Sequence, residues 1–406
     1  MVRHRSLPPV AFCVALVGFA TLAFAQDAVR IGVLSDMSGP YADIAGKGSL
    51  AAAELAVEEF GGKIGDRRIE IVSADHQNKP DVGSATARKW FDQDGVDMIV
   101  DVITSSVALA VQHIAREKEK IVIFSGAGAS QLAGESCARN SFVWTWDTYA
   151  LTNVASQTFG RENLRDWYLI EVDCALGRAL DQGIRDALGR IGGKVVGVSR
   201  HPLGTADFSS FLLQAQSSGA PVIALLNGGA DAVNALKQAS EFQIGKDGKQ
   251  TFASLAMLIS DVKAIGLKEA QGLRITESFY WDLDDRSRAW SARYAAKMGG
   301  SMPSMIQAGT YSAVRHYLKA VEAAGSKATK GVIAAMYALP VEDATVSAGA
   351  RLRADGRLMR DFYSFRVKSP AHSRGPWDLY ERVATVPAEE AAVPVTQSAC
   401  PLLKGQ

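Results

Sequence analysis

Three short segments combine hydroxyl side chains with glycine, a combination that suits the binding of an anion. They are residues 35–41 (Ser-Asp-Met-Ser-Gly-Pro-Tyr), 104–106 (Thr-Ser-Ser) and 125–130 (Ser-Gly-Ala-Gly-Ala-Ser). Hydroxyl groups and uncovered backbone N–H groups at the start of a helix stabilise a carboxylate or another anion. Taken singly, each serine or threonine is better explained as an ordinary helix cap than as a ligand contact. The presence of three such segments favours a binding site over three unrelated caps.

Two aromatic clusters could form the walls of such a site. One covers residues 144–149 (Trp-Thr-Trp-Asp-Thr-Tyr) and the other residues 279–281 (Phe-Tyr-Trp). Aromatic rings can enclose an apolar or aromatic molecule, although the same rings could simply pack a junction between domains. Because neighbouring side chains of an extended segment point to opposite faces, at most half of each cluster can face one cleft.

The sequence contains no complete motif for catalysis, metal binding or nucleotide binding. Its histidines show no H-E-x-x-H spacing, and there is no G-x-S-x-G element. Residues 46–49 (Gly-Lys-Gly-Ser) resemble part of a phosphate loop, but Tyr41 stands where its first glycine belongs, and residues 126–128 lack the third glycine of a dinucleotide motif. We therefore predict that the protein is not an enzyme and holds neither a cofactor nor a metal.

The elements that must position these segments alternate between strands and helices. We predict strands over 29–34, 68–74, 96–103, 120–125, 166–172, 194–200 and 222–226, with helices over 48–60, 81–94, about 104–118, 177–191, 207–218 and 230–242. This order is typical of parallel sheets covered by helices on both faces. Ligands of such sheets bind beyond the carboxyl ends of the strands, where the hydroxyl-rich segments lie. The restart of the order near residue 166 predicts two lobes of similar build.

Length, charge and the first residues narrow the class of protein. A chain of 406 residues favours two or three domains. The balance of 44 basic and 43 acidic residues leaves no basic block for nucleic acid. The basic residues 3–5, the apolar run 10–24 and the small residues at 23 and 25 predict a signal peptide cleaved after Ala25. The apolar run is short for a membrane span. We expect an exported, periplasmic protein.

Taken in order, these segments resemble the substrate-binding proteins of branched-chain amino acid transporters, the leucine/isoleucine/valine family. The matching stretches are 31–41, 103–106, 125–132, 144–151, 201–216 and 307–313. The most characteristic part is residues 202–209 (Pro-Leu-Gly-Thr-Ala-Asp-Phe-Ser). The resemblance implies the type I periplasmic binding fold, an α/β fold of two Rossmann-like lobes with parallel sheets, joined by a three-segment hinge that closes over a ligand.

The resemblance also implies a domain organisation and a function. Residues 1–25 would be the signal peptide, 26–147 with 278–356 the N-terminal lobe, and 148–277 with 357–406 the C-terminal lobe and tail. We expect a monomeric solute-binding component of an ABC uptake transporter, whose partners are a small-molecule ligand and membrane permease subunits, with no nucleic acid. A ligand-sensing receptor module of the same fold and a binder of amino acids or amides remain open alternatives.

For the site, the resemblance implies that Ser105 and Ser106 lie in the region that holds the ligand carboxylate. Residues 127–129 would supply a backbone carbonyl and N–H group from the neighbouring loop. Together with the strand ends and the aromatic clusters, the candidate ligand contacts are Tyr41, Thr104, Ser105, Ser106, Ala127, Gly128, Ala129, Trp146, Tyr149, Cys174, Asn227 and Tyr280.

Three departures from the family pattern argue against an α-amino acid ligand. Gly128 stands where amino-acid binders usually carry a threonine, and Leu176 stands where they carry an aromatic residue. Residues 255–260 contain no acidic residue, although amino-acid binders keep a glutamate there for the ammonium group. We therefore predict a small organic acid, with an aromatic acid and a keto acid as candidates.

Three cysteines follow the predicted leader. Relatives often share a cysteine near Cys137 and near Cys400, so the resemblance implies a disulfide between these two residues. Cys174 would be left as a free thiol that either lines the cleft or acts as a small buried apolar residue.

Overall fold

The computed structural model describes residues 1–2, 28–245 and 247–404. The predicted cleavage site after Ala25, and the apolar run before it, lie outside these ranges. Among the described residues, no helix combines the length and the apolar character needed to cross a membrane.

The first sheet has six strands in the order β2-β3-β1-β4-β5-β6, and β2 alone runs antiparallel to its neighbour. The strands are β1 (Val29–Ser35), β2 (Lys63–Ile64), β3 (Arg67–Asp75), β4 (Met98–Asp101), β5 (Ile121–Phe124) and β6 (Ser141–Val143). The helices on this side are α1 (Gly46–Glu59), α2 (Pro80–Asp92), α3 (Ser105–Glu117), α10 (Asp285–Lys297), α11 (Met305–Ala324) and α12 (Thr329–Ala338), with the short turn η1 (Ser130–Ala133). We call this sheet and its helices lobe 1.

The second sheet has seven strands in the order β15-β14-β11-β10-β9-β7-β8. Its parallel part consists of β7 (Asp166–Val172), β8 (Lys194–His201), β9 (Val222–Leu226), β10 (Thr251–Ser254) and β11 (Arg274–Glu277), while β14 (Phe362–Val367) and β15 (Tyr380–Val386) are antiparallel. Its helices are α4 (Thr148–Arg161), α5 (Ala175–Arg190), α6 (Ser209–Ser217), α7 (Gly229–Glu241), α8 (Ile259–Ile265) and α9 (Leu267–Ala270). We call this unit lobe 2.

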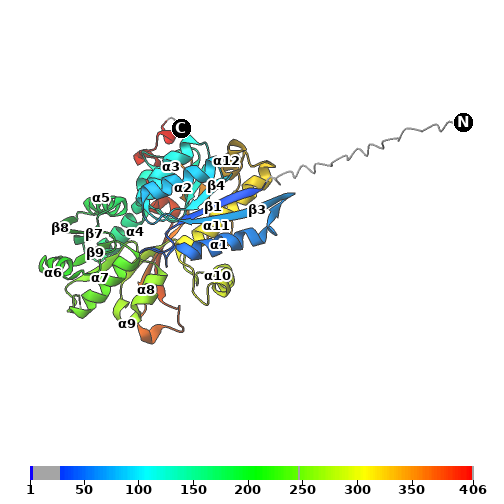
Figure 1. Ribbon diagram of the computed structural model, residues 1–406. Helices are drawn as coiled ribbons and strands as arrows, with labels where there is room; N and C mark the ends of the chain where they lie inside the picture. The colour runs from blue at the N-terminus through cyan, green and yellow to red at the C-terminus, as the bar shows by residue number, and fades with distance from the viewer. Residues whose placement is uncertain (3–27, 246, 405–406) are drawn as a thin grey trace.

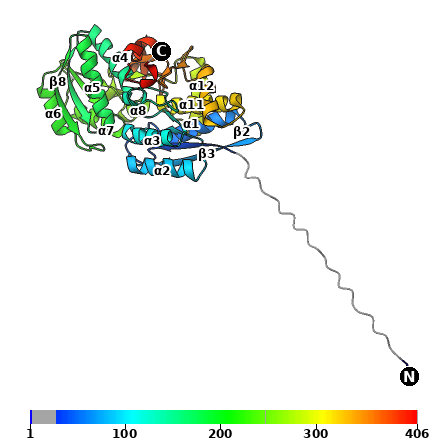
Figure 2. The same ribbon diagram turned by 90° about the horizontal axis from the view of Figure 1, so that it is seen from above.

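The two lobes lie on opposite sides of the molecule, with the green elements of lobe 2 gathered at one end and the blue strands and yellow helices of lobe 1 at the other (Figures 1 and 2). Separate apolar clusters pack α2 and α3 against the first sheet, and α6, α7 and α8 against the second. The predicted α/β fold of two mainly parallel sheets is confirmed. The predicted helices begin and end within a few residues of the observed ones. The periodic apolar face that packs on the sheet extends over the length of each helix, so the sequence pattern marks its bounds.

Three chain segments connect the lobes. The first runs over residues 144–147 between β6 and α4, and the second over 278–284 between β11 and α10. The third is the short link at residues 360–361, which joins β14 to the hairpin of β12 (Arg351–Leu352) and β13 (Leu358–Met359). The lobe boundaries at residues 147, 277 and 356 remain a prediction.

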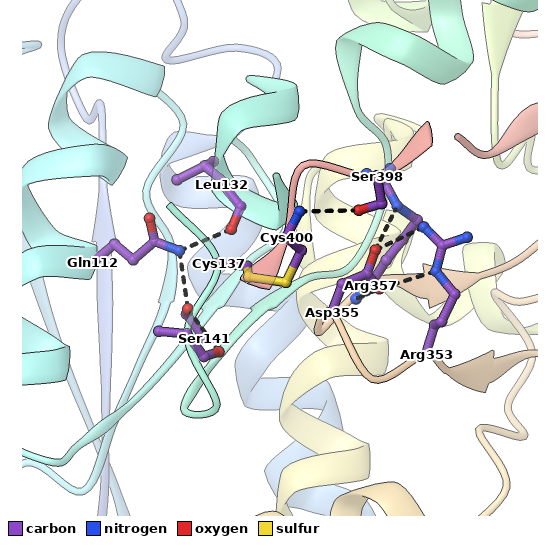
Figure 3. Close-up of a disulfide and its surroundings, with 10 residues drawn as sticks. Gln112, Leu132, Cys137, Ser141, Arg353, Asp355, Arg357, Ser398 and Cys400 are labelled. Carbon is purple, nitrogen blue, oxygen red and sulfur yellow. Dashed lines mark hydrogen bonds and ion pairs between the residues drawn. A yellow bond between two sulfur atoms is a disulfide. The ribbon is translucent and has the colours of Figure 1, made fainter. Parts of the chain in front are cut away.

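The predicted disulfide between Cys137 and Cys400 is confirmed, with Cα atoms 5.6 Å apart. After β15 the chain forms α13 (Ala388–Ala391), where the carbonyl of Glu390 accepts a hydrogen bond from Asn153 of α4. It then reaches Cys137, which follows η1 in lobe 1 (Figure 3). The C-terminal tail therefore links the second sheet covalently to lobe 1.

Candidate functional site

A small cavity of about 20 Å³ lies between the lobes. Its walls are Tyr41, Ile44, Ile103, Trp146, Leu176, Gly228, Ala256, Leu258, Met305 and Ile306. These residues come from both lobes and from the first crossing segment, and none carries a charged side chain. A volume of this size holds about one water molecule. The lobes must therefore separate before an organic molecule can enter.

The walls of this cavity are built from the first turns of helices. Ile103 directly precedes the N-cap of α3, Leu176 lies in the first turn of α5, and Gly228 is the N-cap of α7. Ile306 is the second residue of α11. The backbone dipoles of a helix place a partial positive charge at its N-terminus. The cavity therefore combines apolar walls with an electrostatic preference for negative charge.

Helix α3 keeps its first N–H groups available. The hydroxyl of its N-cap, Thr104, contacts the side chain of Asn78 and makes no capping hydrogen bond. Ser105, the first residue of the helix, is buried behind it. The first N–H groups of a helix have no partner inside the helix. Neither Ser105 nor Ser106 lines the cavity, so the carboxylate region at these residues remains a prediction.

Other helix starts at the cavity already have partners. The carboxylate of Asp261 accepts hydrogen bonds from the N–H groups of Leu258 and Gly229, and so serves both α8 and α7. The hydroxyl of Ser304 accepts a hydrogen bond from the N–H of Gln307 in α11. Burial raises the pKa of Asp261 to about 7. Asp261 directly follows the stretch 255–260, which contains no acidic residue, and its carboxylate is occupied by these backbone groups.

The loop after β1 holds Tyr41 over the cavity. The carboxylate of Asp36 accepts hydrogen bonds from the N–H groups of Gly39 at 2.6 Å and Tyr41 at 2.9 Å, and from the amide of Asn78 at 2.7 Å. Burial raises the pKa of the Tyr41 hydroxyl well above its usual value, and the nearby Cys174 thiol of lobe 2 adds to the shift. Tyr41 lines the cavity, whereas Cys174 does not.

A direct hydrogen bond also joins the two lobes at this loop. The carbonyl of Pro40 accepts it from the N–H of Ala230 in the first turn of α7, at 3.1 Å. A Cβ atom on Gly229 would lie 2.2 Å from the same carbonyl oxygen. The absence of a side chain at residue 229 allows the two backbones to meet.

The ring of Trp146 packs directly against Gly128. A Cβ atom on Gly128 would lie 2.3 Å from the nearest atom of the Trp146 ring, which is too close for any side chain. The indole N–H of Trp146 donates a hydrogen bond to the carbonyl of Gly126 at 3.1 Å and fixes the ring in this place. The ring therefore occupies the space that the threonine of amino-acid binders would need, and presents an aromatic wall to the cavity.

The residues at the other two departures from the family pattern, Leu176 and the stretch 255–260, also contribute to the cavity wall. Leu176 lines the cavity from lobe 2, and Ala256 and Leu258 of the stretch 255–260 line it as well. None of these side chains can pair with an ammonium group, since all three are aliphatic. These three wall residues therefore offer no side-chain acceptor for an ammonium group.

Several predicted contacts lie behind or beside the cavity. Ala127 and Ala129 are buried in the core of lobe 1. The side-chain amide of Asn227 is fully buried and lies 2.9 Å from a ring nitrogen of His201. Cys174 is a half-buried free thiol at the N-cap of α5, and burial raises its pKa.

Two predicted aromatic contacts lie elsewhere. Tyr149 lines a separate crevice of about 670 Å³ between η1, α5 and the tail, and its ring lies under the guanidinium of Arg190. Tyr280 stacks on Tyr380 in the core of lobe 2 and donates a hydrogen bond to the carbonyl of Trp377. Of the aromatic candidates, Tyr41 and Trp146 line the cavity.

Sequence reasoning missed the end of β4. Asp101 and Val102 have φ angles of 81° and 52°, a left-handed backbone that is unusual for residues with side chains and most unusual for a β-branched one. Asp101 is fully buried beside the hydroxyls of Ser35 and Ser49, and burial raises its pKa to about 6. This strained turn directs Ile103 and the start of α3 into the cleft. No feature of the side chains alone reveals such a backbone conformation.

Comparison with known proteins assigns this architecture. Residues 28–375 match the family described as periplasmic binding protein. A periplasmic binding protein from Burkholderia mallei is 44% identical; the match covers 93% of this chain and 100% of that chain, with a TM-score of 0.90. The periplasmic ligand-binding protein of a branched chain amino acid ABC transporter from Burkholderia xenovorans LB400 is 42% identical with the same coverage and a TM-score of 0.83.

The same fold occurs in a more distant protein with a bound aromatic acid. A solute binding protein of an ABC transporter from R. palustris, solved in complex with benzoate, is 21% identical. The match covers 92% of this chain and 100% of that chain, with a TM-score of 0.82. At this level of identity the likeness shows the fold alone.

Proposed function

The chain belongs to the family of periplasmic binding proteins that serve branched-chain amino acid transporters, and from this premise we propose that it captures a small organic acid with an aromatic body for an ABC uptake transporter. Members of this family bind substrates and are not enzymes. In this role the protein acts in the periplasm, binds its ligand as the lobes close, and delivers it to the permease subunits.

One observation carries the choice of ligand: the Trp146 ring fills the space above Gly128. An aromatic ring prefers an offset or edge-on partner, and such a pair contributes about 0.5–1.5 kcal/mol beyond the area that it buries. Leu176 supplies the opposite wall from lobe 2. A flat apolar ligand satisfies both walls, whereas the ammonium group of an amino acid finds no carboxylate there.

The carboxylate of the ligand is assigned to the start of α3. The N–H groups and hydroxyls of Ser105 and Ser106, together with the backbone of residues 127–129, form its binding region. A charge at a helix N-terminus gains about 0.3–1 kcal/mol when exposed and up to about 2 kcal/mol when partly buried. Micromolar binding needs about 8 kcal/mol in all. Most of the affinity must therefore come from burial of the ring.

The proposal is tested by calorimetric titration with a matched set of ligands. Benzoate, benzamide and cyclohexanecarboxylate separate the contributions of the charge and the ring, while 4-methyl-2-oxopentanoate and leucine represent the keto acids and amino acids. We expect benzoate-type acids to bind with micromolar affinity, and benzamide at least tenfold more weakly. Tightest binding of leucine would refute the organic-acid assignment. A preference for the oxo acid would refute the aromatic body and retain the acid.

A pair of tryptophan variants tests the wall directly. Trp146→Leu should weaken the binding of an aromatic acid at least tenfold and that of cyclohexanecarboxylate much less, because only the aromatic acid loses a ring–ring contact. Trp281→Leu is the matched control, since Trp281 packs beside Tyr280 away from the cavity. Equal losses in the two variants would show that Trp146 is not a ligand wall.

A further inference from the structure

The threonine that precedes α3 does not cap its own helix. Thr104 has the extended backbone of an N-cap residue, and its carbonyl accepts a hydrogen bond from the N–H of Ala108 at 2.8 Å. A threonine in this position commonly accepts a hydrogen bond from the second or third N–H of the helix, here those of Ser106 and Val107. Its hydroxyl makes no such bond and instead contacts the side-chain oxygen of Asn78, in the loop between β3 and α2.

The surroundings of Asn78 determine which atom of its amide faces Thr104. The carboxylate of Asp36 is fully buried and accepts hydrogen bonds from the N–H groups of Gly39 and Tyr41. The Nδ2 of Asn78 adds a further donor to this carboxylate at 2.7 Å. The other end of the amide, the acceptor Oδ1, is then the atom that faces Thr104. The Thr104 hydroxyl is therefore the donor, and its hydrogen is directed away from α3.

The backbone of the loop after β3 keeps Asn78 in this place. Gln77 and Asn78 have φ angles of 53° and 57°, in the left-handed region that asparagine tolerates better than most residues. The N–H of Asn78 donates a hydrogen bond to Nδ1 of His76 at 3.0 Å. Burial lowers the pKa of His76 to about 4, so its ring is neutral and Nδ1 remains an acceptor at neutral pH. The loop is thus fixed by its own contacts.

On the basis of the function proposed above, in which the ligand carboxylate lies at the start of α3, we propose that Asn78 is a positioning residue for ligand binding. It holds the Thr104 hydroxyl away from α3 and leaves the N–H groups of Ser106 and Val107 free for the carboxylate. Without Asn78, the hydroxyl would turn and cap the helix. A cap and a ligand carboxylate compete for the same N–H groups.

The same amide also joins two parts of lobe 1 that face lobe 2. Asp36 holds the loop of Tyr41, which lines the interlobe cavity, and Thr104 precedes α3. Loss of the bond to Asp36 would act on a ligand of any charge, because it loosens an apolar wall. Release of the Thr104 hydroxyl would act on an anion alone. A charged and a neutral ligand of the same shape therefore separate the two effects.

The test compares Asn78→Gly with a matched control, Asn163→Gly. Glycine removes the side chain and still accommodates the left-handed backbone. Asn163 has a φ of 61°, is exposed, and accepts a hydrogen bond from Arg165 far from the cavity walls. Calorimetric titration with benzoate and benzamide measures the ratio of their affinities. We expect Asn78→Gly to lower this ratio about fivefold, in line with the strength of a threonine cap, and Asn163→Gly to leave it unchanged.

A double-mutant cycle shows whether the effect passes through Thr104. In a Thr104→Val protein no hydroxyl remains to compete with the ligand, so the further change Asn78→Gly should alter the ratio less than about twofold. An equal loss of benzoate and benzamide affinity in Asn78→Gly, or the same fall in the ratio with valine at 104, would overturn the proposal. Either result would give Asn78 a purely structural role.

Hydrogen exchange of the ligand-free protein, followed by NMR, tests the contact without any ligand. The N–H groups of Ser106 and Val107 should exchange more slowly in Asn78→Gly than in the wild type, because the released hydroxyl now accepts from one of them. Unchanged exchange would overturn the proposal. A wild type that binds benzoate and benzamide alike would instead refute the proposed function, and this is seen without any variant; slower exchange in Asn78→Gly would support the role of Asn78 even then.

Discussion

At the scale of single residues, the contact between Gly128 and Trp146 shapes one wall of the interlobe cavity. Residue 128 has no side chain, and the ring of Trp146 occupies the space where a side chain would lie. In the function proposed above, this exchange makes the wall suit an aromatic ring instead of an amino acid. The sequence alone does not reveal the reason for the glycine at 128, because that reason is its contact with Trp146.

Gly128→Ala tests this contact. The added methyl group must displace a ring held by the hydrogen bond to Gly126, so we expect a loss of about 1–3 kcal/mol in the free energy of unfolding. Gly189→Ala in α5 is the control, because its Cβ would meet no atom within 4 Å and alanine favours helix by up to about 1 kcal/mol. Urea unfolding measures both. A Gly128→Ala protein as stable as the control would show that the ring moves freely.

Asp261 makes stability depend on pH. Burial raises its pKa to about 7, whereas an aspartate in an unfolded chain titrates near about 4. The folded protein binds this proton more tightly, so the stabilisation is complete below about pH 4 and is lost as the pH rises through about 7. Between pH 5 and 8, we expect the wild type to lose roughly 2–3 kcal/mol more unfolding free energy than Asp261→Asn.

Chemical denaturation at a series of pH values measures this difference. Asp207→Asn is the control, since Asp207 is exposed and hydrogen bonds from Ser209 lower its pKa, which places its titration below the window. The Asp207 variant should keep the wild-type slope between pH 5 and 8. Parallel slopes for wild type and Asp261→Asn would mean that Asp261 is ionised in the folded protein throughout.

At the scale of elements, the site depends on where helices begin. The starts of α3, α5, α7 and α11 meet at one cavity because each follows a strand or loop that ends at the cleft. In lobe 1 the loop after β1 reaches across to the first turn of α7. When the lobes are closed, the backbone of Pro40 therefore contacts the backbone of residues 229–230, and the residue at 229 is a glycine.

Gly229→Ala should hinder closure. Its φ of +60° disfavours any side chain, and the new methyl group would lie against the Pro40 carbonyl only when the lobes are closed. Gly204→Ala is a matched control, because its φ is +82° but no atom lies within 4 Å of the added Cβ. We expect ligand affinity to fall roughly tenfold or more, about 1.4 kcal/mol, in the first variant relative to the second.

Titration calorimetry of both variants with the same ligand measures the difference, and small-angle scattering shows whether the ligand still compacts each protein. Comparable affinities in the two variants would contradict a closed state that needs the contact between residues 40 and 230.

The sequence predicts elements better than it predicts which side chains face the cleft. Strands and helices follow from apolar periodicity, and β7 and β9 lie over the predicted residues. Periodicity cannot choose between the two faces of an extended segment, so Trp146 and Tyr280 looked equivalent although the latter stacks in the core of lobe 2. Leu258 and Met305 line the cavity but read as ordinary core residues. The left-handed turn at Asp101 has no sequence signal.

At the scale of the whole molecule, the two lobes are held by three crossings and one disulfide. The three crossings are continuous backbone, whereas the disulfide fastens the end of the chain to lobe 1. Its partners are 263 residues apart, so the bond restricts a large part of the unfolded chain. This pairing could be predicted only through the family resemblance, because spacing alone does not select one pair among three cysteines.

Cys400→Ser should lower the free energy of unfolding by about 2–5 kcal/mol, because the unfolded chain regains conformational entropy. Cys174→Ser is the matched control, since Cys174 is a free thiol and its replacement leaves the disulfide intact. Denaturation with and without a reducing agent measures the effect: the reductant should destabilise the wild type and the Cys174 variant, and leave the Cys400 variant unchanged. If the Cys400 variant had the same free energy of unfolding as the wild type, the disulfide would not contribute to stability.

The path of the tail has a consequence for the integrity of the protein. Residues 137 to 400 form a closed covalent ring that contains the whole of lobe 2 and all three crossings. A protease that cuts once in the exposed loop 202–207 would open this ring without dividing the molecule into two pieces. In an oxidising compartment, a nicked copy would thus keep both halves of its cleft together.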